Sequence, residues 1–440
     1  MSLYSSASDF AKDGWLDSYS NQLGSAEGSM LKLLGLNTDS RVKMEGRNTY
    51  MKIQVGDDLG FGITSQGGDF AAAGDIASDE ATLSLVRFGD TIQFDAHEMA
   101  LLDSLDAAAA PIMAKKMSAS RKRVLREIER MAIMDGTGHL AKVASESGST
   151  LTLDVAGNAY SERNPFTWID DPGRSKYLVV DPSTGVDQLT SPSSWTVPST
   201  AEASNTITAS VDTGGAAAGD VVVTYHPAGY GTGTFTSPEM VGLLGMIDDG
   251  NTYLGIDRTS VQQWQSTVVD NSGTLRDISE TLVHQLCNKV ARRSESGMLS
   301  ASSYCAIADP GVWTSYHNLM SNGIRYSVSE TPDIGWGGRE YIPMNGVPLY
   351  KHIYAPRHQI LMVDKSAAGF VGPKFDTSSI VKFIEDGGSV FYRKNASSGQ
   401  GYADAVLMMI AGWIGMYTER PRNHGRLDDL NLTAPTYAGQ

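Results

Sequence analysis

The residues that could carry chemistry are few in this chain and lie apart from one another. The chain has eight histidines and two cysteines, Cys287 and Cys305, with no Cys-x-x-Cys pair. His352 and His358 lie at successive predicted strand ends, but no carboxylate or cysteine joins them at the spacing of a zinc site. We therefore expect structural histidines and two free thiols in a reducing compartment, with a disulfide between the cysteines as the alternative.

Two further patterns have a plain structural interpretation. Asp248, Asp249 and Asn251 could bind a cation, but their spacing is not that of a calcium loop, so a turn is favoured. Residues 229–235 (GYGTGTF) do not open a helix within a β-α-β unit, so a flexible linker is favoured over a dinucleotide site. Neither a GxxxxGK[ST] phosphate loop nor a GxSxG elbow occurs. The sequence predicts no catalytic centre, metal site or cofactor, and an α/β hydrolase is the least favoured alternative.

A basic face on one predicted helix is the main concentration of charge in the chain. Residues 111–136 predict a long amphipathic helix, which Pro111 can begin and Gly136 can end. Its apolar stripe recurs at helical spacing through Met113, Met117, Val124, Ile128 and Met131. The opposite face carries Lys115, Lys116, Arg121, Lys122, Arg123, Arg126 and Arg130.

This basic face needs an explanation because the chain as a whole is acidic, with a formal net charge of −15. We expect the face to meet a complementary partner surface or a polyanion. The alternative is a solvated helix face held by pairs of opposite charge four residues apart.

A long two-stranded ribbon is predicted directly before the helix. Residues 47–55 and 81–95 alternate apolar and polar side chains, as half-buried strands do. An isolated two-stranded ribbon is marginally stable in water, so we expect this one to lie on another subunit. Its tip is acidic, and contacts in trans to basic groups of an adjacent copy, rather than in cis, are expected from Asp57, Asp58, Asp75, Asp79 and Glu80.

The rest of the chain predicts a small β module followed by mixed α/β structure. Residues 140–235 are rich in Ser, Thr, Gly and Val, which is typical of an antiparallel barrel or sandwich. Its strands are expected at 149–155, 175–181, 205–212 and 219–226. Beyond it we expect helices at 275–296 and 310–323, strands at 302–309, 347–356, 358–364 and 403–421, a hairpin of 378–386 with 389–395, and a loose tail after residue 422.

The order of these parts resembles the HK97-like fold of tailed-phage major capsid proteins. Three strings contribute to the resemblance: ERMAIMDGTGHLAKVASESGSTLTLD, GLLGMIDDGNTYLGIDRTSVQQWQS and GWIGMYTERPRNHGRL. It covers most of the chain and implies an α+β fold. Its parts would be an N-terminal arm (1–45), an E-loop ribbon (46–96), a P-domain with the spine helix (97–139), an inserted β module (140–235), an A-domain (236–370), a P-domain hairpin (371–405), and a C-terminal strand and tail (406–440).

The resemblance implies a shell subunit without enzymatic activity. Copies would form the hexamers and pentamers of an icosahedral virion head around double-stranded DNA, assembled in the host cytoplasm. The implied partners are the chain itself, DNA by non-specific contact, and separate scaffolding, portal and decoration proteins. No membrane contact is expected, because no run approaches the ~20 apolar residues of a membrane span.

Two points of the resemblance are left open by the residues. Encapsulin-like nanocompartment shells share the fold, so such a shell protein is the main alternative function. Some family members form isopeptide cross-links from an E-loop lysine, but no lysine occurs here between Lys52 and Lys115. Cross-linking is therefore not expected, and a link from Lys52 to Asn395 is the alternative.

Overall fold

The protein is a mixed α+β chain that forms two compact units. The first unit comprises Met1–Lys52, Glu80–Ala132 and Gly369–Tyr417, and the second comprises Ile53–Asp79, Ile133–Ala368 and Thr418–Gln440. The computed structural model describes residues 30–34, 36–37, 43–45, 48–54, 63, 78–95, 98, 109–154, 177–188, 196, 199–201, 206–210, 213–225, 234–294, 299–323, 341–373, 381–384, 391–395 and 402–432.

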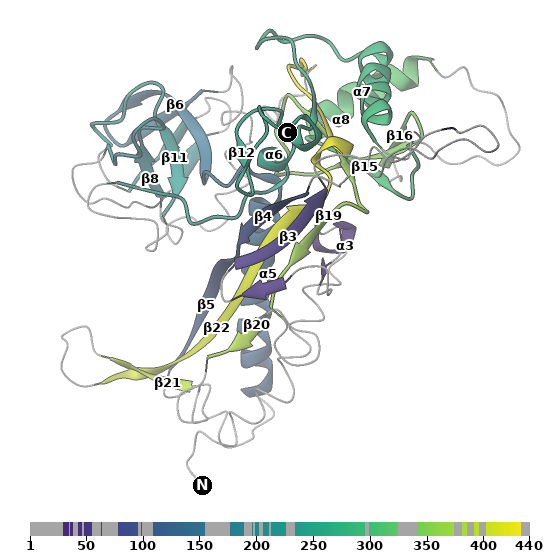
Figure 1. Ribbon diagram of the computed structural model, residues 1–440. Helices are drawn as coiled ribbons and strands as arrows, with labels where there is room; N and C mark the ends of the chain where they lie inside the picture. Colours follow the sequence, from purple (N-terminus) through teal and green to yellow (C-terminus); the bar gives the residue numbers. More distant parts are fainter. Residues whose placement is uncertain are drawn as a thin grey trace, which may run out of the picture. The chain divides into compact units, whose positions relative to one another are not determined.

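The first unit is organised around one long strand, β22 (Tyr402–Thr418). Its partner on one edge is β5 (Val86–Asp95), with Asp95 opposite Ala405 and Val86 opposite Ile414. Figure 1 shows β22 between β5 and β20. The remaining strands of this six-stranded sheet are β1 (Leu36–Asn37), β19 (Ala368–Val371), β20 (Val381–Phe383) and β21 (Phe391–Asn395).

The predicted long helix is confirmed as α5 (Ala109–Ile133). Its buried stripe contains Met117, Val124 and Ile128, as the helical spacing predicts. The last turn is buried all round, from Ile128 through Met134. One face of α5 is therefore buried, and the opposite face is exposed at Lys115 and Lys122.

The predicted ribbon is only partly confirmed. Its first strand is β3 (Asn48–Gln54), which forms a three-stranded sheet with β2 (Lys43–Glu45) and β4 (Ser78–Ser84). The expected second strand is interrupted at Leu85, and its longer part, β5, pairs with β22 instead of β3. The prediction of a single ribbon that continues to Asp95 is therefore wrong. β5 instead pairs along its whole length with β22, which lies far away in the sequence.

The predicted hairpin of 378–386 with 389–395 is also corrected. The two strands exist as β20 and β21, but each pairs with β22. β20 lies opposite Ile410–Gly412, and β21 lies opposite residues from Met408 to Tyr402. A strand as long as β22 offers pairing sites to both, so they line up along one edge of it.

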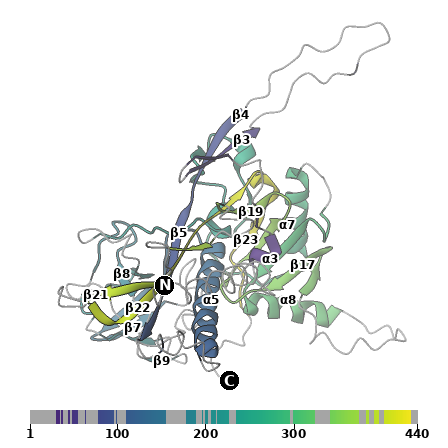
Figure 2. The same cartoon turned by 90° about the horizontal axis from the view of Figure 1, so that it is seen from below.

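The second unit contains a six-stranded α/β sheet with two helices on one core. The helices α7 (Glu280–Arg293) and α8 (Pro310–Gly323) were both predicted, and Figure 2 shows them beside β17 and β23. In sheet order the strands are β14 (Thr267–Val269), β23 (Gly425–Leu427), β18 (Ile360–Asp364), β15 (Tyr304–Ala308), β17 (Val347–Lys351) and β16 (Tyr341–Met344).

The prediction of a loose tail after residue 422 is wrong for the described residues. β23 lies between β14 and β18, and Leu427 and Leu430 are fully buried. Gly425 is needed where α7 approaches, because a Cβ there would lie 2.5 Å from Val290 Cγ2. The segment is mostly polar, so its two buried leucines were not recognised as core residues. Residues 433–440 lie outside the described residues.

The second unit also contains a six-stranded antiparallel sheet between residues 139 and 224. The four predicted strands are present, and β6 and β9 were not foreseen. β6 pairs with β11 through residues 139–142 and with β7 through residues 143–147, with a register shift in the second pairing between Val143 and Ser145. One core collects side chains from five of the strands, among them Leu151, Val179 and Ile207. In sheet order the strands are β8 (Tyr177–Val180), β11 (Val221–Thr224), β6 (His139–Ser147), β7 (Thr150–Leu153), β10 (Thr206–Thr208) and β9 (Ser199–Ala201).

Candidate functional site

The exposed side of α5 is the candidate functional surface. At about 100° per residue, Lys115, Lys122 and Arg126 fall within about 40° of one line along the helix. That line is opposite the buried side chains of Met117 and Val124. Lys115 and Lys122 are exposed, and Arg126 is half-buried. Three cations therefore point away from the core of the first unit.

Two other basic residues of α5 have acidic partners in the same unit. Lys116 Nζ forms an ion pair with Glu98 and donates a hydrogen bond to Gln93 O at 2.8 Å. Arg123 forms an ion pair with Asp90. The sequence analysis singled out neither acid, because nothing local in the sequence shows that β5 lies against this side of α5.

Arg130 is buried and does not contribute to an exposed basic face. It is only 3% exposed, and its Nε donates to Glu127 Oε2 at 3.0 Å. The neighbouring carboxylate of Glu129 is also buried and accepts from Met30 N at 2.8 and 2.9 Å. The Glu129 carboxylate therefore joins the end of α5 to the start of α3 (Met30–Leu34). Helical spacing gave the angular position of Arg130 but not the burial of this last turn.

The acidic side of the expected contact is described only in part. Asp79 and Glu80 lie on β4 and are exposed. Asp57, Asp58 and Asp75 lie outside the described residues. Arg121 is half-buried on the flank of α5. A contact between the acidic ribbon and the basic helix of an adjacent copy stays a prediction.

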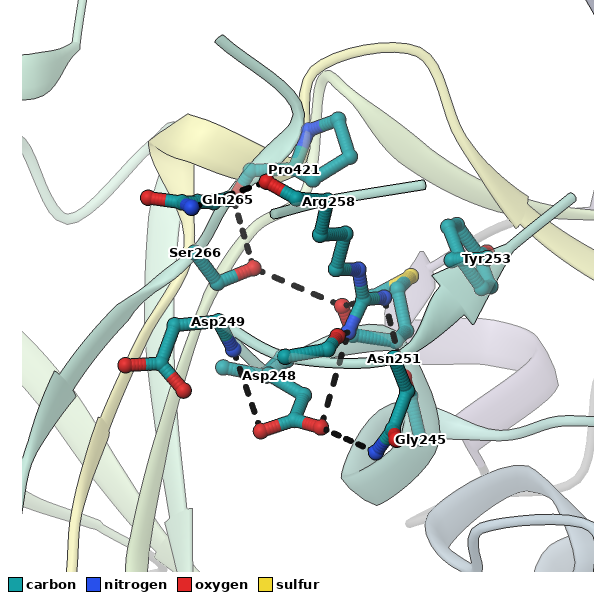
Figure 3. A network of polar contacts seen from close by, with 12 residues as sticks. Gly245, Asp248, Asp249, Asn251, Tyr253, Arg258, Gln265, Ser266 and Pro421 are labelled. Carbon is teal, nitrogen blue, oxygen red and sulfur yellow. Dashed lines mark hydrogen bonds and ion pairs between the residues drawn. The ribbon is translucent and has the colours of Figure 1, made fainter. Parts of the chain in front are cut away.

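The segment with Asp248 and Asp249 is a turn, as the sequence analysis favoured. Asp248 Oδ1 accepts from Asp249 N at 3.0 Å, and Oδ2 accepts from Asn251 Nδ2 at 3.1 Å. Arg258 Nη1 and Arg426 Nη2 lie 3.9 and 3.6 Å from the same carboxylate (Figure 3 shows Arg258). The negative charge of Asp248 is thus compensated by two arginines.

Arg258 is the centre of this network and was missed by the sequence analysis. The side chain is 1% exposed and lies 4.7 Å from the ring of Tyr253. Its Nη2 donates to Gly245 O at 3.0 Å and to Met246 O at 2.8 Å, at the end of helix α6 (Leu243–Met246). Burial lowers the pKa of Arg258, while the charge of Asp248 raises it. No periodicity marks a lone arginine in a turn-rich segment, so no sequence signal could have found it.

The short elements around Arg258 complete this part of the second unit. Ser266 Oγ donates to Pro421 O at 2.9 Å, which ties the network to the C-terminal segment. Trp264 Nε1 donates to Tyr253 O at 3.1 Å. The elements are β12 (Thr252–Tyr253), β13 (Ile256–Asp257), η3 (Gln262–Trp264) and η5 (Pro421–Asn423).

A buried histidine contacts a hydroxyl, but in the wrong protonation state to activate it. His424 Nδ1 accepts from the backbone N–H of Asp364 at 3.0 Å, so the ring proton is on Nε2. Nε2 therefore donates to Thr418 Oγ1, 2.7 Å away. A general base would have to accept a proton from this hydroxyl. Burial also lowers the pKa of His424 to about 4. The three residues form a structural hydrogen-bond chain.

The two cysteines are buried free thiols, as expected. Burial raises the pKa of Cys287 to about 11 and that of Cys305 to about 12. Both are protonated at neutral pH, whereas nucleophilic attack and metal binding need the thiolate. Within the described ranges, no group of three or more His, Cys, Asp and Glu side chains could hold a metal ion. Among the helices described, none is both long and apolar enough to span a membrane.

Comparison with known proteins finds similarity in structure but not in sequence. No protein-family model and no curated protein matches the chain. Solved phage capsid structures match it over most of its length. The cyanophage A-1(L) capsid has a TM-score of 0.47 and 10% identity, with 91% of this chain and 92% of that chain covered. The satellite phage P4 procapsid has a TM-score of 0.41 and 11% identity, with 95% and 91% covered.

An encapsulin shell also matches, over less of the chain. The SrpI encapsulin of Synechococcus elongatus PCC 7942 has a TM-score of 0.27 and 12% identity, with 44% of this chain and 58% of that chain covered. All three TM-scores lie below 0.5.

Proposed function

We propose that this chain is a major capsid protein, which assembles with copies of itself into hexamers and pentamers of an icosahedral head around double-stranded DNA. The observation that carries the proposal is a group of basic residues on α5 that have no acidic partner among the described residues, in a chain of net charge −15. Lys115, Arg121 and Lys122 form no ion pair or hydrogen bond with any described residue. A surface of this kind gains stability from an acidic partner, and a second copy of an acidic chain is one.

The order of elements supports the HK97-like architecture. In that assignment α5 is the spine helix, and the sheet around β22 is the P-domain. The α/β sheet with α7 and α8 is the A-domain. The E-loop is then restricted to residues 46–84, because β5 belongs to the sheet around β22. Residues 140–235 are an inserted β module. The assignment accounts for the extended strands of the first unit, because long elements suit a subunit that tiles over its neighbours.

The contact that we propose joins the acidic ribbon of one copy to the basic helix of the next. Lys116 and Arg123 already have acidic partners within their own unit, and Arg130 is buried. The trans contact is therefore assigned chiefly to Lys115 and Lys122, with Asp79 and Glu80 among the acids that approach them. Charge pairs at such a rim affect the rate and salt dependence of association more than its final affinity.

A smaller part of the proposal concerns DNA and other partners. Basic residues of α5 that no neighbour covers would contact packaged DNA through phosphates, without sequence preference. Separate scaffolding and portal proteins, with or without a decoration protein, would complete a virion head assembled in the host cytoplasm. No cofactor, metal or membrane enters this function.

The test is whether the purified chain forms shells. Electron microscopy should show closed particles, and their content separates the alternatives, since DNA fits a virus and a protein cargo fits an encapsulin-like compartment. A chain that elutes as a monomer under all conditions and turns over a substrate would contradict both and favour a hydrolase.

Charge reversal tests the contact itself. Lys115→Glu with Lys122→Glu should slow assembly about tenfold at low salt, and the difference from the unaltered chain should shrink as the salt concentration rises. Lys289→Glu with Arg292→Glu on the exposed face of α7 is the matched control, with the same change in net charge. Particles that form normally from the first variant would contradict the role of α5 and leave the shell proposal standing.

A further inference from the structure

The outer edge of β5 raises a separate question. β5 pairs with β22 along one edge, and among the described strands none pairs with its other edge. An open strand edge offers unpaired N–H and C=O groups to any other strand, including one from a second copy. Proteins that stay soluble cover or disrupt such edges, so the structure should contain a device that protects this one.

Three side chains form hydrogen bonds with backbone groups of alternate residues on β5. Residues two apart on a strand direct their N–H and C=O groups to the same edge. These groups are therefore on one edge, and each has a side-chain partner in place of a strand. The bonds run from Thr91 N to Asp90 Oδ1 (3.0 Å), from Lys116 Nζ to Gln93 O (2.8 Å) and from Asp95 N to Glu98 Oε2 (3.0 Å).

The same side chains are held in place by α5. Lys116 pairs with Glu98, and Arg123 pairs with Asp90. One oxygen of Glu98 thus meets both the ammonium of Lys116 and the N–H of Asp95. Lys116 Nζ also lies 4.9 Å from the ring of Phe94, on the buried face of β5. We call the set of Asp90, Glu98, Lys116 and Arg123 the edge latch.

We propose that the edge latch closes β5 against strand addition by a second copy of the chain. An incoming strand would need the N–H groups of Thr91 and Asp95 and the carbonyl of Gln93. To reach them it would have to break two ion pairs whose acids are largely shielded, with side-chain exposures of 9% for Asp90 and 22% for Glu98. The proposal concerns the folded chain before any assembly and does not depend on the capsid function.

Removal of the two acids tests the latch in the full-length chain. In Asp90→Ala with Glu98→Ala, the amides of Thr91 and Asp95 should exchange with deuterium about tenfold faster, because each loses a hydrogen bond to a charged acceptor. The variant should also form irregular, concentration-dependent aggregates in sedimentation. Asp249→Ala with Glu146→Ala removes the same charge elsewhere and should behave like the unaltered chain. Exchange and sedimentation equal to this control would overturn the proposal.

A second substitution separates strand addition from general loss of structure. Thr91→Pro, added to the latch variant, removes the N–H that an incoming strand would use, and proline is tolerated on strand edges. It should return the protein to its unaggregated state. Aggregation that persists after Thr91→Pro is added would overturn the edge mechanism.

A milder variant covers the case in which the double alanine variant does not fold. Lys116→Met keeps both acids but frees the carbonyl of Gln93. If its circular dichroism is native-like, this variant should show the same aggregation to a smaller extent. A native-like Lys116→Met protein without any increase in association would contradict the proposal.

Discussion

Arg258 of the second unit and the arginines on the exposed side of α5 have opposite environments. In the second unit, Arg258 is buried and its guanidinium is surrounded by carbonyl oxygens, a carboxylate and an aromatic ring. In the first unit, Arg123 is 55% exposed, and Arg121 and Lys122 have no charged partner among the described residues. The difference separates a charge that the chain uses for its own fold from charges that have no partner within the described residues.

The geometry of Arg258 explains why arginine is used at the buried position. A guanidinium has five donors in a rigid plane, so one side chain can satisfy several carbonyls at once. Gly245 O and Met246 O belong to the end of α6, where the carbonyls have no partner within the helix. The charge also suits the negative end of a helix. An exposed cation on α5 has no comparable set of acceptors.

The largest expected effect comes from removing the buried charge. Arg258→Met should lower the free energy of unfolding of the second unit by about 3–5 kcal/mol, because it leaves buried carbonyls and the Asp248 carboxylate without their partner. Chemical denaturation should show a lower midpoint. Arg121→Met on α5 is the matched control and should change stability by no more than about 0.5 kcal/mol. Equal effects of the two substitutions would remove the contrast between the units.

A pH change should produce an intermediate effect in the second unit. Burial raises the pKa of Asp309 to about 7, and its Oδ2 accepts from Gly311 N at 2.7 Å at the start of α8. The carboxyl of the unfolded chain is already ionised at this pH, so the fold loses stability with rising pH until the folded carboxyl has ionised as well. Stability should therefore fall as pH rises from 6.5 to 8, by on the order of 1 kcal/mol.

The other groups with shifted pKa values titrate mainly below pH 6.5, so the change between pH 6.5 and 8 reports chiefly on Asp309. Burial raises the pKa of Asp428 to about 6, which acts in the same direction at lower pH. His424, with its pKa lowered to about 4, opposes both only below about pH 6.5. Asp309→Asn keeps a helix-capping side chain and should flatten the dependence between pH 6.5 and 8. If stability still falls between pH 6.5 and 8 in this variant, another group causes the dependence on pH.

Elements with a long local period could be predicted from the sequence. The stripe of α5 recurs over about five turns, from Met113 to Met131, and the apolar run of β22 has no competing interpretation, so both were placed correctly. Their partners could not be predicted in the same way. β5 pairs with a strand more than 300 residues later, and nothing near residue 90 in the sequence encodes that choice.

The candidate site shows the same limit at the level of single residues. Sequence spacing identified the basic face of α5, but it could not show that Arg130 is buried or that Asp90 and Glu98 neutralise part of that face. Both facts depend on which strand lies against the helix. Arg258 was missed for a related reason, since its partners are backbone carbonyls and leave no pattern of side chains in the sequence.

The smallest expected effect compares two arginines on the same helix. Arg123 pairs with Asp90 but is more than half exposed, so the pair should contribute about 0.5 kcal/mol. A double-mutant cycle of Arg123→Met with Asp90→Asn should recover that coupling at low salt. The parallel cycle with Arg121→Met should give a value near zero, because Arg121 has no such partner among the described residues.

High salt adds an internal control to these cycles. At about 1 M salt the screening length falls to about 3 Å, so the coupling of Arg123 with Asp90 should shrink while the cost of Arg258→Met stays unchanged. A coupling of Arg123 that resists salt would mean that the pair behaves as a buried one. The edge of β5 would then be held more tightly than the exposure of Arg123 indicates, and the two units would differ less than their arginines suggest.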